Sequence, residues 1–166
     1  MCADRERDRA IDDLPNIKAI DAVTKALHAA YQDCERFLLL HLKSTAVRND
    51  LHGEIITDAS GVCRGLSMLC FVMDSYPTSD LSQQYQLTGS AWWKGPDAEA
   101  GAWRQASTTT RGAAIGYLAL DLDFMDRPKQ TKRTKKLATS VVDLCTRIDG
   151  YMVLYNADVK ASKDAK

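Results

Sequence analysis

The sequence lacks any excess of charge, since 22 Lys and Arg residues balance 22 Asp and Glu residues. Any electrostatic attraction to a partner must therefore come from a local patch. Long hydrophobic runs are also lacking: the longest, residues 66–73 and 112–120, fall well short of the roughly 20 residues of a membrane-spanning helix. The N-terminus mixes both signs of charge and has no apolar signal-peptide core. The sequence therefore predicts a cytoplasmic protein that does not bind a membrane.

Cysteine and histidine lack the spacings of a disulfide framework or a metal site. The five cysteines form no Cys-x-x-Cys pair, which favours buried thiols that act as small hydrophobic side chains. His28, His41 and His52 have no His or Cys partner three or four residues away. Glycine-rich phosphate loops and nucleophile motifs do not occur either. The sequence therefore predicts no metal and no cofactor.

Proline is scarce, with four residues, and most of the chain carries apolar residues at the three- and four-residue spacing of amphipathic helices. A charged arm over residues 1–13 precedes a domain at 14–159, and a polar tail follows at 160–166. The expected helices begin near Asn16, Ile55 and Asp97, with a fourth after a basic segment. These features predict an all-α four-helix bundle, most simply up-down-up-down, with a long irregular connection between its second and third helices.

Two Gly-x-x-x-Gly steps, Gly61 to Gly65 and Gly112 to Gly116, lie inside expected helices. A glycine in a helix interior costs about 0.5–1 kcal/mol relative to alanine. Close approach of another helix is the expected compensation, either within the bundle or at an interface between subunits.

Trp92 and Trp93 lie in the irregular connection. Adjacent residues of a regular element point in different directions, so one of the two rings is expected at the surface. Large aromatic side chains anchor many interfaces. The pair therefore either caps the core or marks a partner interface.

The basic segment, residues 127–136, holds six cations and no acid: Arg127, Lys129, Lys132, Arg133, Lys135 and Lys136. Cations near a helix N-terminus are disfavoured by the helix dipole, by roughly 0.3–1 kcal/mol each. The size of this penalty depends on whether the fourth helix begins at Pro128 or is capped by Thr134. Asp121, Asp123 and Asp126 precede the segment and offset part of the penalty. The surplus of positive charge predicts contact with nucleic-acid backbone or with an acidic partner.

Arg36 and His41 are separated by four residues, a spacing that resembles the Arg-x4-6-His motif of the HEPN family of helical-bundle proteins. The family includes metal-independent ribonucleases, so the resemblance implies catalysis by Arg36 and His41. Phe37 occupies a position that is usually polar in that family. His41 also continues the apolar stripe of the first helix, which favours a buried, hydrogen-bonded histidine instead.

Residues 65–75, with the sequence GLSMLCFVMDS, resemble the central helix of small helical subunits in type III CRISPR effector complexes. Those subunits line a nucleic-acid channel, so this resemblance implies a structural subunit that contacts nucleic acid.

We expect a non-catalytic helical interaction module, a small subunit of a larger assembly, that uses its basic segment to contact nucleic-acid backbone or an acidic partner. Its expected partners are protein subunits or further copies of the chain. A HEPN-like ribonuclease, a CRISPR small subunit and a purely structural or oligomerising protein are the alternatives.

Overall fold

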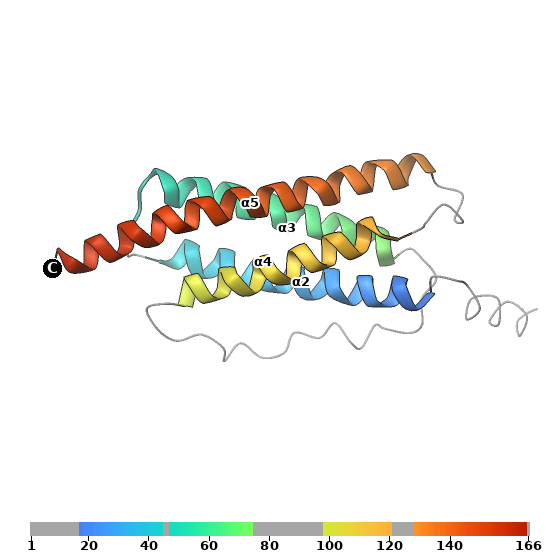
Figure 1. Ribbon diagram of the computed structural model, residues 1–166, viewed down its shortest axis with the longest axis horizontal. Coiled ribbons are helices and arrows are strands. Elements are labelled where there is room, and N and C mark those ends of the chain that lie inside the picture. Colours follow the sequence, from blue (N-terminus) through green and yellow to red (C-terminus); the bar gives the residue numbers. More distant parts are fainter. Residues whose placement is uncertain (1–16, 45–46, 75–97, 121–127, 166) are drawn as a thin grey trace, which may run out of the picture.

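Four helices make up almost all of the structure. The computed structural model describes residues 17–44, 47–74, 98–120 and 128–165. The helices are α2 (Ile17–Lys43), α3 (Asp50–Asp74), α4 (Ala98–Leu118) and α5 (Pro128–Asp164), and the described residues contain no strand. They lie side by side in an elongated bundle (Figure 1). The predicted fold class, an all-α four-helix bundle, is confirmed.

The core runs along the inside of all four helices. Each contributes side chains at helical spacing, and the largest fully buried ones are Ile20, Leu27, Phe37, His41, Ile55, Leu66, Leu69, Met73, Tyr117, Ile148 and Tyr155. Burial of such side chains stabilises a fold by about 1.5–3 kcal/mol each. The apolar stripes therefore explain why the four helices pack together.

The helix ends depend on local residues. The Asn49 side chain accepts a hydrogen bond from the backbone N–H of His52, with 3.1 Å between Oδ1 and N. This cap starts α3 at Asp50, earlier than the apolar pattern indicates. Pro128 opens α5, as its fixed backbone favours. At its other end α5 continues to Asp164, through most of the expected polar tail, and extends beyond the neighbouring helices (Figure 1).

The helix directions differ from the simplest sequence expectation. Cys34 Sγ of α2 lies 3.0 Å from Thr110 Oγ1 of α4, and Val23 of α2 approaches Gly116 of α4, so these helices are antiparallel. α2 also packs antiparallel to α3, and α5 packs antiparallel to α3 and α4 (Figure 1). The order is therefore up-down-down-up instead of up-down-up-down. Every packed pair is antiparallel, as expected.

The connection between α3 and α4 makes this order possible. α3 ends and α4 begins at opposite ends of the bundle (Figure 1). Residues 75–97 could span roughly 75 Å when extended, whereas the 25-residue α3 is roughly 37 Å long. One long crossover connection is a known variant of the four-helix bundle.

The Gly61 to Gly65 step brings α3 against α5. A Cβ atom on Gly65 would lie 2.5 Å from Val141 Cγ2, and one on Gly61 would lie 3.1 Å from Leu144 Cδ1. In the other step, Gly116 approaches Val23 of α2, with 3.2 Å from its would-be Cβ to Val23 Cγ2, but Gly112 has open space around it. Close packing within the bundle therefore explains three of the four glycines.

α3 is the one helix of the described ranges that is long and apolar enough, by length and composition, to cross a membrane. Of its most apolar stretch, 44% is buried inside the bundle. Core helices of water-soluble bundles meet the same criterion.

Candidate nucleic-acid interface

The basic segment forms the first turns of α5. Lys132, Arg133 and Lys136 are exposed, and Lys135 is half-buried. Thr134, between them in sequence, is buried and accepts a hydrogen bond from the Tyr117 hydroxyl of α4. That contact orients the helix so that its cations face outward. Arg127 lies outside the described residues, and of Lys129 only the helical backbone is described.

The start of α5 decides between the two expected dipole penalties. Because the helix begins at Pro128, Lys132 and the three cations after it lie beyond the first turn. The effect of the dipole falls off within that turn, so these four cations carry little of the penalty. Asp121, Asp123 and Asp126 lie outside the described residues.

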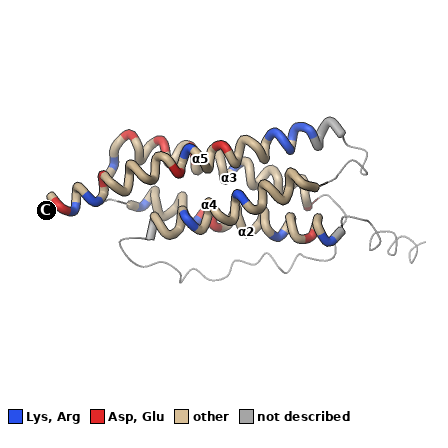
Figure 2. Tube along the Cα trace, viewed as in Figure 1, with Lys and Arg blue, Asp and Glu red and all other residues tan. Residues whose placement is uncertain are grey.

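The stretches around these cations hold no acid between residues 64 and 73 or between 132 and 142, and Asp74 and Asp143 directly follow them. Residues 132–142 of α5 pack beside residues 64–73 of α3, as the contact of Gly65 with Val141 and Leu137 shows. The two segments together hold five cations, the fifth being Arg64, and no acid. We call this surface the basic end. Figure 2 shows the run of Lys and Arg at the start of α5. None of the ion pairs among the described residues involves these cations.

Two large apolar side chains of α3 are exposed in the same region. Phe71 is 79% exposed and Met68 is 54% exposed. Sequence reasoning treated residues 66–73 as an apolar run and missed this. The helical phase is the signal that distinguishes them, because Met68 and Phe71 fall outside the buried stripe of Leu66, Leu69 and Met73.

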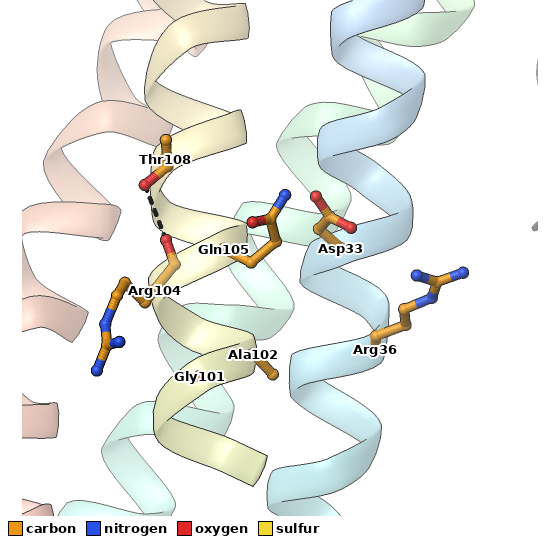
Figure 3. Close-up of a pocket in the computed structure, with 7 residues that line it drawn as sticks. All are labelled: Asp33, Arg36, Gly101, Ala102, Arg104, Gln105 and Thr108. Atoms are coloured by element: carbon orange, nitrogen blue, oxygen red, sulfur yellow. Dashed lines mark hydrogen bonds between the residues drawn. The ribbon is translucent and has the colours of Figure 1, made fainter. Parts of the chain in front are cut away.

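A surface groove of about 560 Å³ lies between α2 and α4. Asp33, Gln105 and Thr108 line it, and so does Arg36. In Figure 3 the Asp33 and Gln105 side chains face each other across the groove, whereas Arg36 points away from α4. The groove is open and has both polar and apolar lining, and no histidine lines it.

His41 does not join Arg36 in this groove. It is fully buried, with its ring stacked on His52 at 4.2 Å and on Phe37 at 5.7 Å between ring centroids. Tyr155 meets its edge at 4.9 Å. The structure therefore places His41 in the core, as the apolar stripe favoured, and does not bring Arg36 and His41 together in one site.

The backbone of His41 also fixes the orientation of the His52 ring. His52 Nε2 lies 2.9 Å from the carbonyl oxygen of His41. Because a carbonyl only accepts hydrogen bonds, Nε2 carries the proton in this contact. The hydroxyl of Tyr155 donates to the carbonyl of Val47, at 3.1 Å. The first contact ties α3 to α2, and the second ties α5 to the chain between α2 and α3.

Asp149 of α5 organises a polar network with α4 that the sequence does not reveal. Its carboxylate accepts hydrogen bonds from Trp103 Nε1 at 2.7 Å and from Ser107 Oγ at 3.3 Å. Arg111 Nη2 pairs with the other oxygen at 2.5 Å. With its donors already engaged inside the bundle, the network fixes the register of α4 on α5 and offers no reactive group.

The four cysteines in the described part of the chain do not supply a nucleophile. Burial raises the pKa of the Cys63 thiol to about 11 and the pKa values of Cys70 and Cys145 to about 12. Burial also raises the pKa of Cys34 strongly. A thiol needs its thiolate form to react, so these four cysteines are inert at neutral pH.

Two further sequence expectations concern metals and tryptophan. Within the described ranges, no group of three His, Cys, Asp or Glu side chains is placed to hold a metal ion. Trp92 and Trp93, the expected partner interface, lie outside the described residues.

Comparison of the chain with protein-family models, with curated proteins and with solved structures finds no match.

Proposed function

We propose that the protein is a non-catalytic helical module that binds nucleic-acid backbone through its basic end. The observation that supports this function is the concentration of five cations, with no acid, on two packed helix segments of a chain with no net charge. Exposed cations that are not neutralised by neighbours gain free energy when they replace the counterions of a polyanion.

The packing of α5 supports the same function. A loop of cations would lose conformational freedom on binding, at a cost of about 0.5–1.5 kcal/mol per immobilised side chain in addition to the backbone. Here the backbone is already helical, and the bond between Tyr117 and Thr134 holds the helix on α4. Nucleic acid is favoured over an acidic protein because it carries the denser and more regular negative charge.

The experiment measures the salt dependence of binding. Fluorescence anisotropy of a labelled oligonucleotide, titrated with the protein at several salt concentrations, gives the slope of log K against log salt. We expect the variant Lys132→Gln, Arg133→Gln, Lys136→Gln to bind more weakly. Its slope should be smaller in magnitude by roughly two to three, because each phosphate contact contributes about 0.7–0.9.

A matched variant controls for total charge. Lys43→Gln, Lys160→Gln, Lys163→Gln removes three exposed cations at the other end of the bundle. It should bind with nearly the slope of the wild type. Equal losses in the two variants, or binding by neither them nor the wild type at low salt, would show that the basic end is not a nucleic-acid site.

A further inference from the structure

Arg64, Met68 and Phe71 share the outward face of α3. They are spaced by four and three residues, and all three are exposed. Phe71, at 79% exposure, gives the fold almost none of the stabilisation that a buried phenylalanine gives. An exposed aromatic ring beside clustered cations is a feature of surfaces that bind nucleic acid.

The register of α3 on α5 places Phe71 beside the basic segment. Asp58 Oδ2 lies 3.2 Å from Arg147 Nε, and further along the pair Gly61 meets Leu144 and Gly65 meets Val141. Continuing this antiparallel register puts Met68 level with Leu137 and Phe71 level with Thr134. Phe71 is therefore level with the middle of the segment that holds Lys132, Arg133 and Lys136.

Two cations of α5 lie on the side of that helix that borders α3. Lys136 and Arg133 precede Arg147 by 11 and 14 residues, close to whole numbers of helical turns, so the three share one face. Arg147 contacts Asp58 of α3, which identifies the face. Asp143, four residues before Arg147, lies on the same face, so the face is purely cationic only around Arg133 and Lys136. The glycines bring the two helices close, so these two cations run alongside the row of Arg64, Met68 and Phe71.

We propose that the basic end binds single-stranded nucleic acid, with a base stacked on the Phe71 ring while the flanking phosphates contact Arg64, Arg133 and Lys136. This inference rests on the proposed function and adds the class of ligand. In a duplex the base faces are stacked on one another, so an exposed ring gains little from it, whereas the unstacked bases of a single strand are available. Met68 widens the apolar platform next to the ring.

The charge selects this ligand over other occupants of an apolar surface. A second copy of the chain related by a two-fold axis would place five cations against five cations. An acidic protein would satisfy the cations but would not require an aromatic platform. A single strand of nucleic acid fits both the cations and the aromatic ring, because it alternates phosphates with aromatic bases.

The experiment uses the full chain with four labelled probes: an oligothymidine and an oligouridine of about 15 nucleotides, an abasic oligonucleotide of the same length, and a hairpin duplex. We expect the wild type to prefer the single strand. Phe71→Ala should weaken binding to oligothymidine by roughly 5- to 100-fold and leave binding to the abasic probe unchanged, because only the former has bases to stack. Comparing the thymidine and uridine probes distinguishes DNA from RNA.

Conservative and matched variants separate stacking from general hydrophobic contact and from folding. Phe71→Trp should retain the affinity of the wild type, whereas Phe71→Leu, which is apolar without an aromatic face, should behave like Phe71→Ala. Ile115→Ala removes a side chain that is 61% exposed on α4 and should have no effect. Circular dichroism confirms that each variant is folded.

Three outcomes would overturn the inference. If Phe71→Ala binds oligothymidine as the wild type does while the Lys132, Arg133 and Lys136 variant loses binding, backbone contact stands and stacking is wrong. A preference of the wild type for the duplex would likewise show that stacking is wrong. If the wild type binds none of the probes at low salt but binds vesicles of anionic lipid, or an acidic protein, both the inference and the proposed function are wrong.

Discussion

The two ends of the α3 and α5 pair use the same kinds of side chain for opposite purposes. At the basic end, residues 64–73 and 132–142, Phe71 and the cations are directed to solvent, with no acid in either segment. At the other end, residues 50–63 and 143–164, seven acids face three Lys and Arg residues. There the aromatic rings of His52 and Tyr155 are packed on His41. We call this second region the packed end.

This difference implies that the packed end stabilises the fold and that the basic end is available to bind a ligand. The rings of the packed end contact His41, and the Nε2 atom of its His52 and the hydroxyl of its Tyr155 are hydrogen-bonded within the bundle. The basic end has a ring and a set of charges that do little for the fold. Substitutions at the packed end should therefore affect unfolding, and those at the basic end should affect ligand binding.

The largest expected effect compares the same substitution at a core ring beside the packed end and at the basic end. Phe37→Ala removes a fully buried ring that contacts His41 and Trp103, with 5.0 Å between the centroids of the Phe37 and Trp103 rings. It should lower the free energy of unfolding by about 3–5 kcal/mol, through lost burial and the cavity left behind. Phe71→Ala should change it by less than about 0.5 kcal/mol. Urea unfolding followed by circular dichroism measures both, and similar values would remove the distinction between the ends.

The next effect tests the contact that sets α3 against α5. Gly65→Ala places a methyl group 2.5 Å from Val141 Cγ2, so the helices or the branched side chain must shift. We expect a loss of about 1–3 kcal/mol from overpacking. Gly112→Ala is the control, because nothing lies within 4 Å of its would-be Cβ, and it should stabilise the protein by about 0.5–1 kcal/mol. If Gly65→Ala stabilised the protein equally, the close approach of the two helices would be refuted.

The third prediction concerns alkaline pH at the packed end. Burial raises the pKa of Cys145 from 9.0 to about 12, so the folded state keeps the proton when the unfolded chain has lost it. The contribution of this thiol is fully present below pH 9 and is lost as the pH rises toward 12. In that window it should lower the free energy of unfolding by up to about 1.4 kcal/mol per pH unit.

Cys145→Ala isolates that contribution. The variant has a cavity and is less stable at neutral pH, yet its stability should fall less steeply with pH than that of the wild type. Urea unfolding between pH 8 and about 10.5 gives the two slopes. Identical slopes would mean that Cys145 ionises as easily in the folded state as in the unfolded chain.

The helices could be predicted from the sequence, but their directions could not. The apolar stripes through Leu27, Leu66 and Ile148 identify three helices and their buried faces, because helical spacing is a local property. The direction of α4 depends on residues 75–97, which are long enough for either arrangement. Contacts such as Cys34 with Thr110 settle it only in three dimensions.

The candidate site could likewise be predicted only in part. Lys132, Arg133 and Lys136 can be identified from the sequence because the cations are clustered within ten consecutive residues. Their proximity to Phe71 depends on the α3 to α5 register, which is fixed by side chains that meet across the bundle, such as Asp58 with Arg147. Arg36 and His41 illustrate the opposite case. They are close in sequence, but Arg36 lines the surface groove and His41 is buried in the core.

The smallest expected effect tests whether the cations of the basic end help the fold at all. Lys132 with Lys136, Lys132 with Lys135, and Arg133 with Lys136 are like-charged pairs three or four residues apart on α5. Each such pair destabilises a helix by roughly 0.2–0.5 kcal/mol. The variant Lys132→Gln, Arg133→Gln, Lys136→Gln removes all three pairs and should raise the free energy of unfolding by about 0.6–1.5 kcal/mol. The gain should shrink as added salt screens the repulsion in the wild type, which urea unfolding at low and high salt measures. A loss of stability would show instead that these cations are paired within the fold, and the basic end would then resemble the packed end.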